Sequence, residues 1–193
     1  LIIDASKGYT KEGKNNKLRA SDIKRIVDAV VVREDIPKFC KKVTRDTIRA
    51  NEYNLNIPRY VDSSDKGETW DIYASIFGGI PHSEIDELTE YWAAFPTLKK
   101  QLFNDINGSY ATVATEDVIQ TIKANADVLG FVAKYRAAFE GFDAQLDERL
   151  IGQVYDIVIP NEESGIANEI FSRLAGIPLV DKYYAYQLLD DEW

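Results

Sequence analysis

Residues 115–150, TEDVIQTIKANADVLGFVAKYRAAFEGFDAQLDERL, decide the fold class of this chain. Apolar residues recur along this stretch at three- and four-residue intervals, which places them on the faces of helices. Glycines at 130, 141 and 152 are expected to divide the stretch into separate helices. The apolar positions are Val118, Ile119, Ile122, Leu129, Val132, Tyr135, Phe139, Phe142, Leu146 and Leu150. The stretch therefore predicts several consecutive helices.

Both flanks of this stretch also show helical spacing. Upstream, apolar residues line one face of a helix that begins near Pro81 and ends before Pro96. Downstream, one helix is predicted over residues 162–175, and another from Lys182 onward behind a capping Asp181. The later part of the chain is therefore predicted to be all-helical.

The first residues predict a short α/β strip instead. Leu1–Ile3 are typical of a buried strand, and the polar, glycine- and asparagine-rich residues 6–17 are typical of a loop. Ser21 is the expected N-cap of an amphipathic helix. A second strand is predicted at residues 39–43, before a short helix capped by Thr44. The apolar positions of the amphipathic helix are Ile23, Ile26, Val27 and Val30.

Charge and composition divide the chain at one place. Ser63–Glu68 are polar and turn-rich, which is typical of a linker. Residues 1–62 contain 14 Lys and Arg against 9 Asp and Glu, a net charge of +5, and residues 63–193 have a net charge of -14, which together make -9. We predict two domains with these bounds. A phosphate backbone repels the acidic one, so protein is its expected partner.

Several features bear on the cellular context. No apolar run approaches the roughly 20 residues that cross a bilayer, so no membrane association and a cytoplasmic location are expected. The chain has no methionine, and Leu1 begins within a strand-like run, so we expect both ends to lie within a longer protein. Cys40 is alone, which excludes an internal disulfide and favours an ordinary half-buried thiol.

The search for catalytic side chains finds no convincing set. His82 is the only histidine, and its position at a helix start favours a solvated or capping residue over a triad member or metal ligand. Carboxylates at 84, 86, 87 and 90 lie mostly opposite the apolar stripe, as solvation and the helix dipole require. Gly78-Gly79 lacks the third glycine and lysine of a phosphate-binding loop. We therefore assign no catalytic, cofactor-binding or metal-binding residue.

Two aromatic stretches have alternative interpretations. Tyr183, Tyr184, Tyr186 and Trp193 could stack on bases, but their acidic surroundings favour packing in a core or a protein interface. Amino-methyltransferases hold a flipped base with an Asn-Pro-Pro-aromatic loop, whereas Asn56-Ile57-Pro58-Arg59-Tyr60 has an inserted isoleucine and a single proline. This match is therefore rejected.

Four segments nevertheless resemble one family in their order and spacing. They are LIIDAS (1–6), NKL (16–18), IKRIV (23–27) and NEYNLNIPRYVD (51–62). Together they resemble the modification subunit of type I restriction-modification systems, just after its catalytic motifs. WDIYASIFGGIP (70–81) and IPLVDKYYAYQ (177–187) are similar to one branch of that family, which extends the resemblance over most of the chain.

The resemblance implies a role for each predicted domain. In that family the full subunit is an S-adenosylmethionine-dependent adenine-N6 DNA methyltransferase, whose cofactor-binding and catalytic motifs lie upstream of the segments quoted above. Residues 1–62 would be the C-terminal strip of the methyltransferase domain. Residues 63–193 would be a helical extension that docks on the specificity subunit. A second modification subunit and, in some systems, a restriction subunit would complete the complex that meets DNA.

Two rival functions follow from the same residues. A free-standing helical interaction domain that merely shares the Asn-Leu-Asn-Ile-Pro-Arg-Tyr turn would be a stable monomer without upstream sequence. A hydrolase that uses the acidic helices would need Glu84, Asp86 or Glu87 to face a cleft, which the apolar periodicity argues against. The family resemblance favours a non-enzymatic fragment of an enzyme whose DNA target is set by another subunit.

Overall fold

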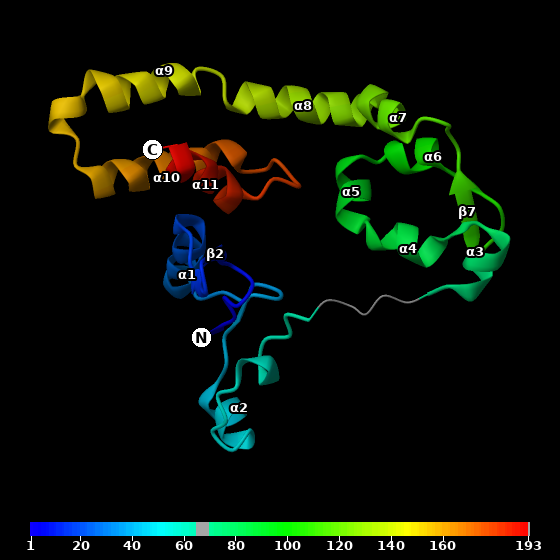
Figure 1. The fold of residues 1–193 in the computed structure, drawn as a ribbon, viewed down its shortest axis with the longest axis horizontal. Helices are drawn as coiled ribbons and strands as arrows, with labels where there is room; N and C mark the ends of the chain where they lie inside the picture. Colours follow the sequence, from blue (N-terminus) through cyan, green and yellow to red (C-terminus); the bar gives the residue numbers. More distant parts are fainter. Residues whose placement is uncertain (65–69, 193) are drawn as a thin grey trace. The chain divides into compact units, whose positions relative to one another are not determined.

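The computed structural model describes residues 1–64 and 70–192, and the chain divides into two compact units. Unit 1 contains Leu1–Glu68 and Asp181–Trp193, and unit 2 contains Thr69–Val180. Helices make up most of the regular structure in both (Figure 1). This confirms the predicted mainly α fold with a short α/β strip at its start.

Two predictions concern residues outside the part of the chain that the structure describes. The predicted linker Ser63–Glu68 lies mainly on residues 65–69, and Trp193, predicted to pack with the last tyrosines, also lies outside. The division into residues 1–62 and 63–193 stays a prediction.

Unit 1 begins with the α/β strip. Strand β1 (Ile2–Ile3) pairs antiparallel with β4 (Cys40–Lys41), so both predicted strands are confirmed. Between them in sequence lie a hairpin of β2 (Thr10–Glu12) and β3 (Asn15–Lys17) and helix α1 (Ala20–Val32). The hairpin therefore separates the first strand from helix α1 in sequence.

The β2–β3 hairpin corrects the prediction of a loop over residues 6–17. Its strands contain only polar residues and are exposed, so they lack the apolar alternation that identifies a half-buried strand. Glu12 pairs with Asn15, which leaves a two-residue turn. Gly13 in that turn has φ of 63°, as the first central residue of a type II′ turn requires. Turn chemistry was thus the signal that the sequence analysis missed.

Helix α1 begins earlier than predicted. Its N-cap is Arg19 rather than Ser21, and Ser21 lies in the first turn. The Asp22 carboxylate accepts hydrogen bonds from the backbone N–H of Arg19 at 3.0 Å and from its Nε at 2.9 Å. This cap, in which the Asp22 carboxylate accepts from the N-cap residue Arg19, replaces the serine cap that the sequence predicted.

The rest of the strip is short helices and turns. Helix α2 (Arg45–Ala50) is capped as predicted by Thr44, whose side chain accepts a hydrogen bond from the N–H of Thr47 at 3.1 Å. The turn η1 (Ile57–Arg59) precedes the buried Tyr60. The Tyr60 hydroxyl donates to a backbone carbonyl six residues earlier at 2.6 Å, which fixes this closing turn.

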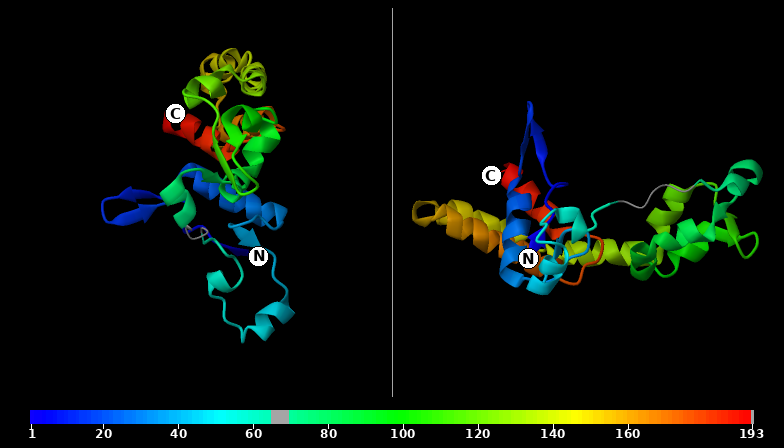
Figure 2. Two further views of the ribbon diagram at one scale, coloured as in Figure 1. Left: turned by 90° about the vertical axis from the view of Figure 1, so that its right-hand side faces the viewer. Right: turned by 90° about the horizontal axis from the view of Figure 1, so that it is seen from below.

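Helix α11 (Lys182–Glu192), at the other end of the chain, completes unit 1. Asp181 accepts a hydrogen bond from the N–H of Tyr183 at 2.9 Å, as expected of the predicted cap. The helix packs against α1, as Figures 1 and 2 show. Tyr186 and Gln187 are buried in this contact. A segment more than 150 residues away in sequence thus belongs to the α/β strip.

Unit 2 begins with a small sheet among short helices. The strands β5 (Ile80–Pro81), β7 (Tyr110–Val113) and β6 (Phe103–Asp105) form an antiparallel sheet in the order β5-β7-β6. The sequence had predicted only helices here. The strands are two to four residues long, too short for period-two alternation to be recognised. The helices of this region are α3 (Ile72–Phe77), α4 (His82–Glu87), α5 (Thr89–Ala94) and α6 (Leu98–Leu102).

The core of unit 2 lies where α6 meets α7 and α8. Phe95, Leu98 and Leu102 are buried together, and the ring of Phe131 meets that of Phe95 edge-on at 5.6 Å between centroids. Asn125 is buried beside them. Its Oδ1 caps α8 by accepting from the N–H groups of residues 127 and 128, and its Nδ2 donates to residues 97 and 101. The side-chain amide of Asn125 therefore links α6 to the start of α8.

The remaining helices of unit 2 double back on themselves. As Figure 1 shows, α8 and α9 run on from α7, and α10 returns alongside them. Arg173 on α10 holds this return, since its guanidinium donates to the Ala138 carbonyl and to Gln145 Oε1, both at 2.8 Å. Within the described residues, no helix is both long enough and apolar enough to cross a bilayer. The elements are α7 (Val118–Ala124), α8 (Ala126–Ala138), α9 (Phe142–Asp147), the turns η2 (Glu148–Gly152) and η3 (Val154–Asp156), and α10 (Ile159–Leu174).

Candidate functional site

The groups considered for catalysis lie on the consecutive short helices α4 and α5 of unit 2. His82 is the first residue of α4, and its Nε2 lies 3.2 Å from the carbonyl oxygen of Asn107 and 3.4 Å from Asp105 Oδ1. The carboxylates at 84, 86, 87 and 90 are all exposed. Among the described residues, no cluster of three or more His, Cys, Asp or Glu could hold a metal ion. Nothing in this arrangement supports the hydrolase interpretation.

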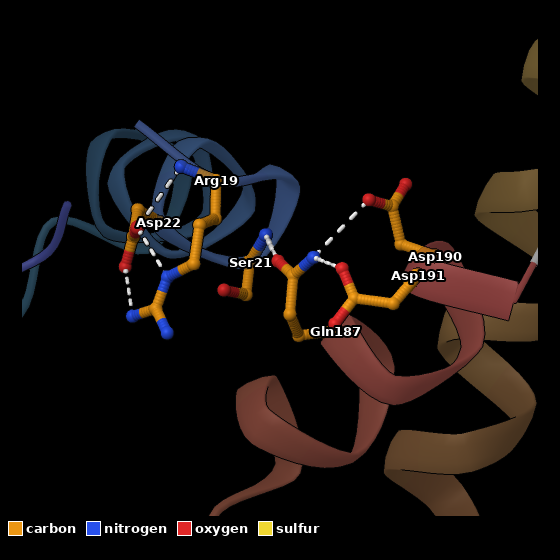
Figure 3. A network of polar contacts seen from close by, with 6 residues as sticks. All are labelled: Arg19, Ser21, Asp22, Gln187, Asp190 and Asp191. Carbon is orange, nitrogen blue, oxygen red and sulfur yellow. Dashed lines mark hydrogen bonds and ion pairs between the residues drawn. The ribbon is translucent and has the colours of Figure 1, made fainter. Parts of the chain in front are cut away.

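The most organised polar arrangement is the contact between α1 and α11, drawn in Figure 3. Gln187 is buried, and its Oε1 accepts a hydrogen bond from the backbone N–H of Ser21 at 3.0 Å. Its Nε2 donates to Asp191 at 2.7 Å and to Asp190 at 3.2 Å. An N–H in the first turn of a helix has no partner within the helix. Gln187 supplies that partner from the other end of the chain.

The first turn of α1 is held from its other side by Arg19 and Asp22, also drawn in Figure 3. Hydrogen bonding from Arg19 lowers the pKa of Asp22 below its ordinary value, against a smaller opposing effect of burial. Gly8, at the base of the β2–β3 hairpin, lies against this carboxylate, because a Cβ on Gly8 would be 2.6 Å from Asp22 Oδ1. The hairpin base, the α1 start and α11 are thus fixed at one junction.

Aromatic and cationic side chains extend the α1–α11 contact along the helices. The Tyr183 hydroxyl donates to Asp28 Oδ2 at 3.2 Å. The Arg25 guanidinium lies over the ring of Phe39 at 4.4 Å and near that of Tyr183 at 5.8 Å. Tyr183 and Tyr186 are therefore packing residues, as the sequence favoured over base stacking, whereas Tyr184 is exposed.

The opposite face of α1 is apolar and exposed. We call this set the α1 stripe, and it consists of Ile23, Val27, Val30 and Val31, which are 50%, 51%, 46% and 75% exposed. The buried residues of α1 are Ala29 and Ser21, and the backbone of Ser21 bonds to Gln187 of α11. An amphipathic helix ordinarily buries its apolar face. In α1 the small and polar face is packed, and the apolar face that the sequence predicted is left without a cover in the described chain.

Unit 2 has its own exposed apolar segment around η3. We call it the η3 patch, and Tyr155 at its centre is 98% exposed. Five large apolar side chains within nine residues are more than the scattered exposure normal for a soluble surface. The η3 patch consists of Ile151, Val154, Tyr155, Val158 and Ile159.

Comparison with known proteins finds one family model and two methylase subunits that are similar to parts of this chain. Residues 1–69 match the family model described as N-6 DNA Methylase. The chain is 32% identical over 113 residues to the type I restriction enzyme MpnII methylase subunit of Mycoplasma pneumoniae, covering 58% of this chain and 20% of that protein. It is 35% identical over 112 residues to the MjaVIII methylase subunit of Methanocaldococcus jannaschii, covering 56% of this chain and 18% of that protein.

These matches confirm the predicted resemblance to the modification subunit of type I restriction-modification systems. The chain spans about a fifth of the length of the curated relatives it matches. No solved structure matches the chain. The family-model match covers the hairpin, α1 and the α1 stripe, whereas α11 and the η3 patch lie outside it.

The alkaline behaviour of Tyr183 tests the α1–α11 contact. Burial raises the pKa of its phenol to about 12, and the nearby Asp28 carboxylate adds to the effect. The protonated phenol therefore stabilises this contact fully below about pH 10, and the contribution is lost as the pH rises from 10 to 12. A ¹³C NMR titration of labelled tyrosine, assigned with Tyr183→Phe, is expected to give that pKa, and Asp28→Asn is expected to lower it.

Lys24→Gln is the matched control, because it removes the cation that pairs with Asp28 and leaves the phenol–carboxylate hydrogen bond. Its effect on the Tyr183 pKa should be smaller than that of Asp28→Asn. An ordinary Tyr183 pKa near 10 would mean that α11 does not pack on α1 in solution.

Proposed function

We propose that this chain is the C-terminal part of a type I modification subunit and that its role there is structural. Residues 1–62 complete the methyltransferase domain, and residues 63–193 dock the subunit on the specificity subunit. A second modification subunit and DNA meet through the complete complex. Methyl transfer from S-adenosylmethionine to adenine belongs to the complete subunit. The family-model match over residues 1–69 and the two methylase-subunit relatives support this proposal.

The α1 stripe is the observation that carries the proposal. It lies within the segment that matches the N-6 DNA methylase model, on a helix whose other face is already packed against α11. In an α/β domain, helices bury their apolar faces on the central sheet. The occupant that fits the stripe is therefore the sheet of the same methyltransferase domain, formed by sequence outside this chain.

The residues of this chain do not fit S-adenosylmethionine. A nucleotide-type cofactor is held where a glycine-rich turn joins a strand directly to a helix N-terminus. Here a hairpin separates β1 from α1, and the first turn of α1 is taken by Gln187 and Asp22. We infer that the cofactor is bound by other parts of the complete subunit, and we assign no catalytic step to this chain.

The η3 patch is the proposed docking surface for the specificity subunit. Protein interfaces are enriched in tyrosine and other aromatic side chains, and a few such anchors dominate the binding energy. Tyr155 at the centre of the patch is the expected anchor. The net charge of -14 over residues 63–193 disfavours DNA as the occupant and favours protein.

A charge placed on the α1 stripe tests the first part of the proposal. In the isolated 193-residue chain, Val27→Asp should change the free energy of unfolding by less than about 0.5 kcal/mol, because Val27 is exposed there. In the complete subunit the same change should cost about 3 kcal/mol or more, because it buries an unpaired carboxylate. Urea unfolding of both proteins measures the difference.

Val32→Asp is the matched control. Val32 is also exposed but lies about 140° around the helix from Val27, so its substitution should be mild in both proteins. If Val27→Asp were equally mild in the complete subunit, the stripe would not be a domain contact, and a free-standing interaction domain would be the better interpretation.

Truncation of the central tyrosine tests the docking surface. Tyr155→Ala should weaken binding of the chain to the specificity subunit by about tenfold or more, as expected for an aromatic anchor. Isothermal titration calorimetry with the specificity subunit of the same restriction-modification system would measure this affinity. Tyr91→Ala, at another exposed tyrosine of unit 2, is the control and should leave the affinity unchanged. Equal affinities of both variants and the parent would place docking elsewhere.

A further inference from the structure

The β2–β3 hairpin is a protruding basic ribbon whose side chains are all exposed. It extends beyond α1 in both views of Figure 2. Every residue from Tyr9 to Leu18 is exposed, and this segment contains three lysines and one glutamate. The ribbon adds nothing to a core, since its strands carry no buried side chain. Its composition is therefore better explained by an external partner than by stability.

The charges on the ribbon are divided between its two faces. Cross-strand partners share a face, so Thr10, Glu12, Asn15 and Lys17 lie on one side. Glu12 and Lys17 form an ion pair on that side at 3.4 Å. The other side, which we call the Lys11 face, contains Tyr9, Lys11 and Asn16, and the Lys11 ammonium lies 5.6 Å from the centre of the Tyr9 ring.

The Lys11 face has the chemistry of a phosphate-binding surface. Lysine, asparagine and tyrosine all donate hydrogen bonds, and these side chains make many of the phosphate contacts of DNA-binding proteins. In the described chain no carboxylate pairs with Lys11 or with Lys14, the second central residue of the turn. The face and the tip are thus cationic without internal compensation, whereas the charge on the opposite face is neutralised by Glu12.

The base of the hairpin is anchored on the start of α1. There Gly8 lies against Asp22, and Asp22 accepts three hydrogen bonds from Arg19. A two-residue turn closes the tip. The major groove of B-DNA is wide enough to admit a two-stranded β-ribbon. The two-stranded shape of the hairpin and its positive charge therefore both fit duplex DNA.

We propose that the β2–β3 hairpin contacts the phosphate backbone of duplex DNA through the Lys11 face and Lys14. The inference rests on the proposed function, which brings this segment to DNA, but the contact itself is carried by residues of this chain alone. Lysine–phosphate contacts carry no sequence information, so the hairpin positions the duplex and leaves target choice to other groups.

The test is a titration of the ¹⁵N-labelled 193-residue chain with a 16-base-pair duplex at about 50 mM salt, followed by amide NMR shifts. The largest shifts are expected in residues 9–17. Lys11→Ser and Lys14→Ser should each raise the Kd about tenfold. Each phosphate contact contributes about 0.9 to the slope of log affinity against log salt, so at about 50 mM salt the loss of one contact costs about one order of magnitude in affinity. Amide signals outside the hairpin report whether each variant is folded.

Two control variants sharpen the result. Lys17→Ser removes the same charge from the other face of the same hairpin and should weaken binding less than Lys11→Ser. Lys100→Ser removes an exposed lysine of unit 2 and should change the Kd by less than twofold. Equal losses in the Lys11 and Lys17 variants would contradict the assignment of the face.

Three outcomes would overturn the proposal. The first is the absence of amide shifts at the hairpin with a millimolar duplex, and the second is a set of shifts centred on other residues. The third is binding of poly-glutamate as tight as binding of the duplex. This third outcome would make an acidic protein the partner. None of them involves the specificity subunit or upstream sequence. Failure here would therefore leave the proposed structural role of the chain standing, and failure of the Val27 or Tyr155 tests would leave the DNA contact standing.

Discussion

Helix α1 is the element on which the rest of unit 1 depends, because one of its faces packs against α11 and the other is apolar and exposed. Gln187 on α11 satisfies an otherwise unpaired N–H of its first turn, and Ser21 and Ala29 allow close packing there. The free energy of leaving a buried amide unsatisfied is about 1–3 kcal/mol, so this contact favours one position of α11 over others. The apolar face has no cover in the described residues, and in the proposed function it packs on the remainder of the methyltransferase domain.

Because α11 belongs to unit 1, it gives unit 2 a second connection to that unit. Unit 2 lies between α1 and α11 in sequence, yet both of its ends return to unit 1. Unit 2 is thereby joined covalently to unit 1 at both of its ends rather than at one. In the proposed complex, a partner held at the η3 patch would be connected to the methyltransferase domain through both ends of unit 2.

Local patterns in the sequence predict most helices but not their partners. The spacing of Ile23, Ile26, Val27 and Val30 predicts α1, and Thr44 and Asp181 are confirmed as caps. The hairpin was missed because its strands are polar, and the β5-β7-β6 sheet because its strands are very short. The Gln187–Ser21 bond joins residues 166 positions apart, and no local pattern carries that information. The apolar periodicity of α1 indicates a buried face, but only the structure shows that residues 1–64 and 70–192 do not bury it.

Chemical labelling at the α1 stripe tests the central claim most directly. A cysteine introduced by Val27→Cys can be followed by mass spectrometry with a thiol reagent, while the native Cys40 is buried. In the isolated chain it should react at the rate of an exposed thiol, and in the complete subunit it should react at least a hundredfold more slowly. Equal rates in the two proteins would contradict the account, because the stripe would then remain exposed in the complete subunit.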